Sequence, residues 1–410
     1  MRVYYADAGL IGNSGHHADQ CRVIVDELGA RGIPVSVLGF AELEPTVRAS
    51  LQARSFFRWY RYAQSDGDPE RGWFNAFERG ARTTREDLAT LGEIGADDVV
   101  FLASASAAQL MGAALWLTDL APAGAPQVVM HFGMDPGVDA QPAPGGGVRL
   151  LPRDPRIEAT AALCRRVAPE LRKLGGRRLR VGYAYANGAA AYRLLLDHAV
   201  EVVPLWECAT TGCRNRVGKR PIVVGVLGHQ RNPDKGYHLV PEIVAALLQS
   251  DADLRFLAHN AGPTDMPQAQ EAMRELAARE PRVTLVEQAV DRTGWIALLD
   301  SVDLVLCPYS PRRYQLLPSG IHAQAIANAI PSVVPAGTAL AQLSDEFGAP
   351  GTTFTRNDAP SVLDALRRAL ERYDHYAAIA ASAAAQWPSR FGPGKLVDSI
   401  LGTAGAGPSR

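Results

Sequence analysis

The sequence contains no long uninterrupted hydrophobic segment. Its longest candidate, residues 103–117, is interrupted by Ser104, Ser106 and Gln109, so no segment is expected to span a membrane. Charge of one sign is not in excess either, because 42 Lys and Arg residues balance 43 Asp and Glu residues and the net charge is −1. No basic field is therefore expected to attract nucleic acid.

Cysteine is scarce, with five residues in a chain of 410. An odd, scattered set of cysteines does not predict a disulfide framework, and the start of the chain has no secretory signal. We therefore expect free thiols and a cytoplasmic location. Cys208 and Cys213 have no second Cys or His pair nearby, which favours coincidence over a zinc site. No Asp-rich metal motif is present, so no metal cofactor is expected.

Strands that alternate with helices organise the first half of the chain. The composition, 47% hydrophobic and 21% charged residues, is that of a soluble globular protein. A chain of 410 residues is too long to fold around a single hydrophobic core, so two domains are expected. Apolar runs predict strands over residues 3–6, 35–38, 99–103, 127–131, 179–184 and 200–204. Strands separated by helices predict a doubly wound parallel α/β domain.

The second half repeats this pattern. Strands are predicted over residues 222–227, 254–259, 283–286, 302–307 and 330–335, again with helices between them. We therefore expect two Rossmann-like α/β domains facing a central cleft. The predicted parts are a first domain 1–206, a linker 207–219, a second domain 220–387, a segment 388–401 that packs back on the first domain, and a flexible tail 402–410.

An insertion of helical and polar character is predicted over residues 41–96. Within it, RSFFRWYRYA (54–63) contains five aromatic residues and three arginines. One interpretation is an amphipathic helix laid on the first domain. The other is a contact with an acceptor substrate or with a membrane surface, through Arg58, Trp59 and their neighbours, because arginine and aromatic rings suit interfaces.

A candidate anion site lies in the stretch 302–335. The predicted strand 302–307 is followed by a proline-rich loop, and Pro-Ser-Gly at 318–320 begins a helix that runs to about residue 329. Ser319 is a plausible N-cap, and Gly320 lets a ligand approach the backbone closely. The free N–H groups at the start of a helix bind anions such as phosphate.

Two such domains, the helix start at Ser319 and a glycine-lysine turn after a strand resemble the GT-B glycosyltransferases. The resemblance is to the large retaining family that includes glycogen synthases and bacterial mannosyltransferases, and it covers about residues 1–40 and 97–400. Fold, activity and stereochemistry below are what this resemblance implies. It predicts a sugar transfer from a nucleotide-diphospho-sugar donor to a hydroxyl acceptor on a glycan, lipid or protein, with retention of configuration.

The first domain matches the family at two places. Its glycine-rich turn has glycines at 9, 12 and 15 and is followed by His16 and His17. The resemblance assigns Gly15 to the donor and His16 and His17 to the acceptor, although such turns also serve tight packing. A strand that ends in His131 resembles the strand whose histidine lies near the donor sugar. The alternative for His131 is a buried structural histidine.

The second domain matches less evenly. The stretch 228–236 resembles the phosphate-binding turn, so Lys235 takes the place of the family's lysine, with an ordinary exposed lysine as the alternative. His229 stands where the family has arginine, and Arg231 is a candidate substitute. A helix N-terminus and a lysine suit the negative charge that develops on a departing diphosphate without a metal.

The chain departs from the family in its paired glutamates. These would fall on Leu316 and Gln324, so neither acid is present. Gln324 can still hydrogen-bond to ribose hydroxyls. The resemblance assigns the backbone of Ser319, Gly320 and Ile321 to the donor diphosphate.

Two other functions remain open at this point. A nucleotide-sugar 2-epimerase shares the architecture, and the missing glutamates also allow a non-catalytic nucleotide-sugar-binding scaffold. Contact with the inner face of a membrane is a further interpretation of the aromatic-basic stretch.

Overall fold

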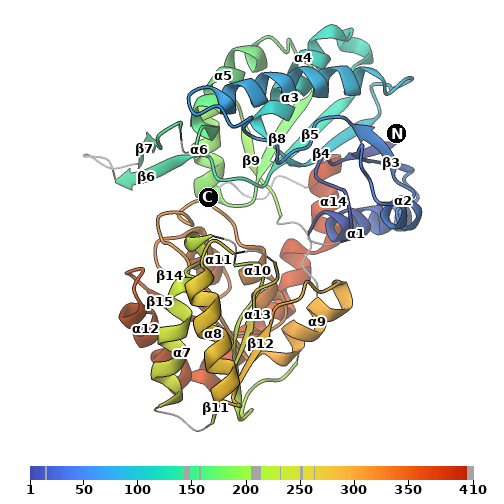
Figure 1. Ribbon diagram of the computed structural model, residues 1–410. Helices are drawn as coiled ribbons and strands as arrows, with labels where there is room; N and C mark the ends of the chain where they lie inside the picture. Colours follow the sequence, from blue (N-terminus) through green and yellow to red (C-terminus); the bar gives the residue numbers. More distant parts are fainter. Residues whose placement is uncertain are drawn as a thin grey trace. The chain divides into compact units, whose positions relative to one another are not determined.

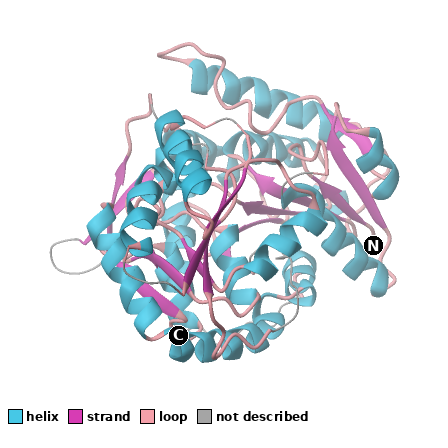
Figure 2. Ribbon diagram, turned by 60° about the horizontal axis from the view of Figure 1, so that its bottom comes forward, coloured by secondary structure: helices cyan, strands magenta, loops and turns pink. Residues whose placement is uncertain are grey.

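The computed structural model describes residues 1–13, 16–142, 148–156, 158–204, 214–230, 232–249, 253–262 and 264–403. The chain divides into two compact units. The N-terminal unit comprises Met1–Glu207 and Phe391–Arg410, and the C-terminal unit comprises Cys208–Arg390. Each unit is a parallel sheet covered by helices (Figures 1 and 2). Among the described residues, no helix has both the length and the apolar character needed to cross a membrane.

The N-terminal unit contains a seven-stranded sheet in the order β3-β2-β1-β4-β5-β8-β9, with all neighbouring strands parallel. Its strands are β1 (Val3–Ala6), β2 (Val35–Phe40), β3 (Arg54–Phe57), β4 (Val99–Ala105), β5 (Gln127–Phe132), β8 (Leu179–Tyr183) and β9 (Val200–Val202). Its helices are α1 (His16–Ala30), α2 (Pro45–Ser50), α3 (Gly72–Ala89), α4 (Ala107–Asp119), α5 (Thr160–Arg172), α6 (Ala186–Leu196) and α14 (Pro393–Leu401), with a short η1 (Pro122–Gly124).

The final helix belongs to the N-terminal unit. Leu396, Val397 and Ile400 of α14 are fully buried in the same core cluster as the apolar face of α1. Asp398 accepts a hydrogen bond of 2.7 Å from Arg31, the residue directly after α1. Figure 1 shows the red α14 beside the blue α1. α14, which follows the C-terminal unit in the sequence, thus completes the core formed around β1 and α1.

The C-terminal unit contains a six-stranded parallel sheet in the order β12-β11-β10-β13-β14-β15. Its strands are β10 (Ile222–Val226), β11 (Leu254–His259), β12 (Val283–Val286), β13 (Leu304–Leu306), β14 (Ser332–Pro335) and β15 (Gly351–Phe354). Its helices are α7 (Val240–Leu248), α8 (Pro267–Arg279), α9 (Arg292–Ser301), α10 (Gly320–Ala327), α11 (Ala339–Glu346), α12 (Ala359–Glu371) and α13 (Tyr373–Phe391), with η2 (Pro233–Lys235) and η3 (Tyr237–Leu239).

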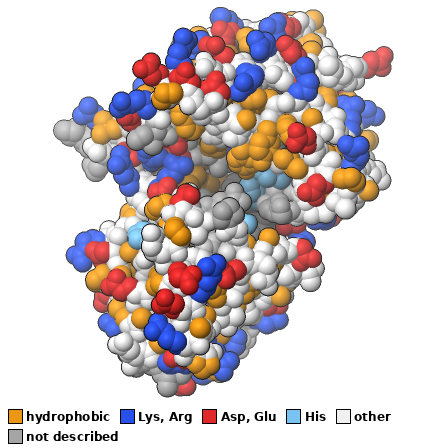
Figure 3. All heavy atoms as spheres, viewed as in Figure 1, with side chains coloured by type: hydrophobic (Ala, Val, Ile, Leu, Met, Phe, Trp, Pro, Cys, Tyr) orange, Lys and Arg blue, Asp and Glu red, His pale blue; other side chains and the backbone are white. Residues whose placement is uncertain are grey.

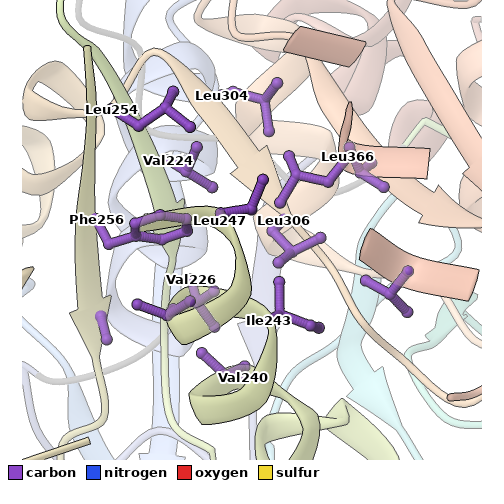
Figure 4. Close-up of a cluster of buried hydrophobic side chains, with 14 of the residues drawn as sticks. Val224, Val226, Val240, Ile243, Leu247, Leu254, Phe256, Leu304, Leu306 and Leu366 are labelled. Carbon is purple, nitrogen blue, oxygen red and sulfur yellow. The ribbon is translucent and has the colours of Figure 1, made fainter. Parts of the chain in front are cut away.

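Apolar side chains from both layers form the core of the C-terminal unit. Figure 4 shows Val224 and Val226 of β10 between the side chains of β11 and β13, with α7 packed over them through Ile243 and Leu247. Such double-sided burial explains why these strands are continuous apolar runs. The prediction of two Rossmann-like parallel-sheet units is therefore confirmed.

The structure differs from the sequence prediction at several places. Residues 54–57 form β3, an edge strand beside β2, in place of an amphipathic helix, because paired phenylalanines favour a pleated, half-buried surface. The insertion 41–96 is therefore not wholly helical. Residues 140–150 were expected to form a loop, but they include parts of the antiparallel strands β6 (Val138–Pro142) and β7 (Val148–Pro152). Both α11 and β15 were missed.

Candidate functional site

Two turns meet at the carboxyl edge of the C-terminal sheet. The turn after β10 is closed by Gly236, whose φ of 69° suits glycine, and a Cβ there would lie 1.8 Å from the carbonyl oxygen of Pro308. The amide of Ser310, in the loop after β13, donates to the carbonyl of Asp234 at 2.8 Å. The lysine-glycine pair at 235–236 is thus part of a tight docking of two loops. This docking fixes the backbone that carries Lys235.

Lys235 lies at the start of α10. Its Nζ donates to the carbonyl of His229 at 2.7 Å. At Gly228, with φ of 93°, an added Cβ would lie 2.4 Å from Cδ1 of Ile321 and 3.9 Å from Nζ of Lys235. The ammonium group and the first turn of α10 therefore share the space above Gly228. Both groups follow parallel strands, which deliver their loops to one edge of the sheet, and the binding role of these residues stays a prediction.

The N-terminus of α10 is capped from within. Ser319 is the N-cap, and its hydroxyl accepts a hydrogen bond of 3.3 Å from the amide of His322. The cap leaves the amides of Gly320 and Ile321 in the first turn, where a helix offers no internal acceptor. Together with the helix dipole, these donors favour an anion. The ammonium group of Lys235 adds a positive charge near the side chain of Ile321 in this turn.

The predicted ribose ligand, Gln324, contacts a tryptophan. Its Oε1 accepts a hydrogen bond from Nε1 of Trp295 on α9, and the residue is half-buried. Trp295 in turn lies beside His259, the last residue of β11, with ring centroids 5.9 Å apart. Burial lowers the pKa of His259, and the charge of Lys235 acts in the same direction, so this imidazole is neutral. The amide NH₂ of Gln324 is the part of the side chain left to contact a ligand.

A polar hollow of about 730 Å³ follows β11, lined by residues that include Asn260, Gln270 and Glu287. The Asn260 amide donates to Oε1 of Gln270 at 2.6 Å, and the Gln270 amide donates to Glu287. Oδ1 of Asn260 accepts from the amide of Gln230 in the turn after β10 at 3.0 Å. The hydrogen bonds link the hollow to the turn that carries His229, which is exposed. These residues were not predicted.

In the N-terminal unit, the predicted acceptor residue His17 is held by a buried aspartate. Nδ1 of His17 lies 2.7 Å from Oδ2 of Asp7, and Nε2 lies 2.8 Å from the hydroxyl of Tyr62. Gly9 makes room for the imidazole, because a Cβ there would lie 2.4 Å from its Cε1. The glycine-rich turn thus serves packing at position 9. His16 is exposed, and its ring lies tilted against that of His17, with ring centroids 4.1 Å apart.

His131 is a buried residue of β5. Its ring lies edge-on to Phe101 of β4, with centroids 4.9 Å apart, and 7% of the residue is exposed. Burial, assisted by the charge of Arg180, lowers its pKa to about 3. Within the described part of the chain, its Nε2 has no hydrogen-bond partner. The structure therefore places His131 inside the sheet layer, in the surroundings of a structural histidine, and its catalytic role stays a prediction.

Trp59 and Arg58 pack against α3. Gly80 of α3 admits the Trp59 ring, since a Cβ at Gly80 would lie 2.6 Å from it. Trp59 is 6% exposed and lines a narrow apolar pocket of about 30 Å³, little more than the space of one water molecule. Nε of Arg58 donates to Asp87 at 2.5 Å. These contacts give both residues a structural role, and their predicted contact with an acceptor stays untested.

Two predicted site residues, Gly15 and Arg231, lie outside the described residues, as do Cys208 and Cys213. Among the residues that the structure does describe, no group of three or more His, Cys, Asp and Glu side chains is arranged as a metal site.

The residues that sequence reasoning missed share one signal. Asp7, Asn260 and Glu287 each follow directly on a parallel strand. The carboxyl ends of such strands meet at one edge of the sheet, where ligands bind. Reading the first polar residue after each strand would have found them.

Figure 3 shows pale-blue histidine atoms on the surface beside a group of orange hydrophobic side chains.

The two parallel sheets and their carboxyl-edge loops define the GT-B fold of glycosyltransferases. The chain is similar to HepE from Anabaena, solved in complex with UDP, with 15% identity over 98% of this chain and 99% of that one, and a TM-score of 0.60. The chain is also similar to sucrose-phosphate synthase from Thermosynechococcus elongatus. The identity is 12% over 99% of this chain and 98% of that one, and the TM-score is 0.62.

A third similar structure is a putative UDP-N-acetylglucosamine 2-epimerase from Listeria monocytogenes. It has 12% identity over 98% of this chain and 95% of that one, with a TM-score of 0.57. A comparison with protein-family models found no match, and a comparison with curated proteins found none. At these identities the likeness establishes the fold, and the activity has to be argued from the site.

Proposed function

We propose that the protein is a glycosyltransferase that moves a sugar from a nucleotide-diphospho-sugar to a hydroxyl acceptor. The C-terminal unit would hold the donor, and the N-terminal unit would hold the acceptor. The observation that carries the proposal is the position of Lys235 beside the first turn of α10, above Gly228. A cation and two helix amides at one point are suited to a diphosphate.

Charge on the leaving group is the chemical demand that this site meets. When the bond between the sugar and the diphosphate breaks, negative charge grows on the phosphate oxygen. Lys235 and the amides of Gly320 and Ile321 would stabilise that charge from fixed positions. The proposed reaction uses no metal, so chelation with EDTA should leave its rate unchanged.

The donor is proposed by analogy in fold. HepE has been solved with UDP-glucose, which makes UDP-glucose the first donor to test, followed by other nucleotide-sugars. Gln324 and Trp295 would contact the donor ribose, and the hollow beside Asn260 would take part of the nucleoside. The acceptor is a glycan, lipid-linked or protein-linked hydroxyl, and a reaction in the cytoplasm, at the inner face of a membrane for a lipid-linked acceptor, is part of the proposal.

Lys235→Ala tests the donor site directly. Each charged hydrogen bond to the diphosphate contributes about 1.5–3 kcal/mol, so this variant should bind UDP at least tenfold more weakly by isothermal titration. Binding of uridine, which has no phosphate, should change little. Arg279→Ala is the matched control, because Arg279 ends α8 and its removal also deletes one positive charge from the unit. Equal losses for UDP and uridine would place the phosphate site elsewhere.

The product separates this function from the two alternatives. A transferase releases free nucleoside diphosphate and forms a new glycoside. A 2-epimerase, the function named for the Listeria structure, leaves the altered sugar attached to its nucleotide. A binding scaffold forms neither product. Incubation of the wild-type protein with UDP-glucose and a panel of hydroxyl acceptors, followed by mass spectrometry, distinguishes the three.

A further inference from the structure

A buried histidine connects the first turn of α10 to two neighbouring elements. His322 is the third residue of α10 and has no exposed surface. Its Nδ1 lies 3.2 Å from Oγ of Ser332, the first residue of β14, and its Nε2 lies 3.0 Å from Oγ of Ser344 on α11. Both serines are buried as well. One imidazole thus joins three elements of the C-terminal unit, which lie side by side in Figure 1.

The imidazole of His322 is neutral, so its two nitrogens have opposite roles. Burial lowers its pKa to about 4, while a hydrogen bond to the carbonyl of Leu340 acts to raise it. Leu340 precedes Ser344 by one turn of α11, and a carbonyl can only accept. The nitrogen that faces α11, Nε2, therefore carries the proton, and Nδ1 accepts from the hydroxyl of Ser332. The side chain is hydrogen-bonded on both sides.

The apolar contacts of α10 restrain its position only weakly. Its buried side chains other than His322 are Ala323, Ala325, Ile326 and Ala327, of which only Ile326 is larger than a methyl group. Packed helices keep their position because ridges of large side chains fit into grooves between the side chains of their neighbours. Alanine methyl groups form low ridges, so a helix with this surface can rotate or slide at small cost. Directional hydrogen bonds remove that freedom.

The two ends of α10 are held by different groups. At its last turn, Nη1 of Arg216 donates to the carbonyl of Asn328 at 2.8 Å, and the Asn328 amide donates to the carbonyl of Gln324 at 2.7 Å. At its first turn, the Ser319 hydroxyl caps the amide of His322, which is a bond within the start of the helix itself. The side chain of His322 links that first turn to β14 and α11.

We propose that His322 is a positioning residue that aims the amides of Gly320 and Ile321 at the donor diphosphate. It acts by fixing the rotation of α10, and its position along its axis, against β14 and α11. The proposal rests on the glycosyltransferase function proposed above, and all its residues belong to the C-terminal unit. Stability alone does not account for the imidazole, because replacing a buried polar group and its partners by apolar groups of the same shape is often neutral. The polar network adds one defined position of the helix.

The first test replaces the whole network by apolar groups. A triple variant, His322→Leu with Ser332→Ala and Ser344→Ala, removes the imidazole together with both hydroxyls that it contacts. Its urea midpoint for the C-terminal unit should equal or exceed that of wild type. Its affinity for UDP, measured by isothermal titration, should fall about fivefold or more, because the first-turn amides lose their fixed direction. Binding of uridine, which has no phosphate, should stay unchanged.

Thr352→Val is the matched control. The Thr352 hydroxyl donates to the carbonyl of Ala365 at 2.7 Å and joins β15 to α12, so this variant loses a buried hydrogen bond of the same unit away from α10. Its UDP affinity should equal that of wild type. If the triple variant does not fold, Ser332→Ala decides, because it deletes one hydroxyl and keeps the imidazole. Its UDP affinity should fall about twofold or more, with uridine binding unchanged.

The outcomes separate this proposal from the proposed function. Weaker UDP binding in the triple variant, with uridine binding and the urea midpoint preserved, supports the positioning role. Weaker UDP binding that comes with a lower midpoint or with weaker uridine binding marks a purely structural histidine and overturns it. If this variant keeps its UDP affinity while Lys235→Ala loses it, the diphosphate site stands and the role of His322 fails. If the wild type binds none of UDP, GDP, ADP and dTDP, both proposals fail.

Discussion

At the scale of single residues, His131 shows how burial changes what a histidine can do. Its folded pKa of about 3 lies below the ordinary value of 6.5, so the unfolded chain takes up this proton first as the pH falls. Stability from this group is therefore complete above pH 6.5 and is lost toward pH 3. Between pH 7 and 4.5 the N-terminal unit should lose about 2–3 kcal/mol through His131.

His131→Gln tests this prediction, because glutamine keeps a polar side chain and has no proton to take up. Urea unfolding of wild type and variant at pH 7 and pH 4.5 gives the two differences in free energy. The wild type should lose about 2–3 kcal/mol more than the variant over this range. If the free energies of unfolding of wild type and variant change equally with pH, the imidazole of His131 is hydrated or protonated in the folded protein.

Single residues also show how far the candidate site could be predicted. The placement of Lys235, Ser319 and Gly320 at one edge follows from the predicted strands, because every loop after a parallel strand opens at the same edge of the sheet. The contacts of His17 with Asp7 and Tyr62 could not be predicted, because these partners lie 10 and 45 positions away in the sequence. Their meeting depends on the packing of β3 and its following loop, which periodicity does not describe.

At the scale of elements, α10 depends on its cap for both stability and binding. Ser319→Ala removes the hydroxyl that accepts from His322 and should lower the free energy of unfolding of the C-terminal unit by about 1 kcal/mol. It should also weaken UDP binding, because the first-turn amides lose their fixed direction. Calorimetric titration and urea unfolding measure the two effects.

A second N-cap of the same unit provides the control. Thr338 caps α11, and its hydroxyl accepts from the amide of Ala341 at 3.3 Å. Thr338→Ala should lower stability by a similar amount, about 1 kcal/mol, with UDP affinity unchanged. If both variants weaken UDP binding equally, the loss comes from general destabilisation and α10 has no special contact with the nucleotide.

Most strands and helices were predictable because parallel strands buried on both faces are continuous apolar runs. The segment 54–57 was not, since Arg54 and Ser55 beside two phenylalanines fit an edge strand and an amphipathic helix equally well. Only its pairing with β2 decides between them. For β15, a four-residue strand with two threonines, local pattern is weak, and pairing with β14 supplies the missing information.

At the scale of the whole molecule, the N-terminal unit requires the last helix. Deleting residues 392–410 removes the buried side chains of Leu396, Val397 and Ile400 from its core. At about 1.5–3 kcal/mol for each buried side chain, the loss is comparable with the total stability of a domain. The N-terminal unit should therefore melt at a much lower temperature or fail to fold, while the C-terminal unit still unfolds cooperatively.

Hydrogen exchange measured by mass spectrometry assigns the loss to one unit. Peptides from β1 and α1 should lose protection in the truncated protein, and peptides from β10 and β13 should keep it. A chain that ends at Thr403 retains α14 and serves as the control. Equal loss of protection in both units would show that the two cores fold as one cooperative body.

The place of α14 also determines the order of events during protein synthesis. A ribosome releases β1 and α1 first, but the helix that covers their shared core is made after the whole of Cys208–Arg390. Until then, apolar residues such as Ile24 and Leu28 lack part of their native cover. The N-terminal unit is therefore completed only after the C-terminal unit has been synthesised, and nascent chains that stop before α14 expose a surface that chaperones bind.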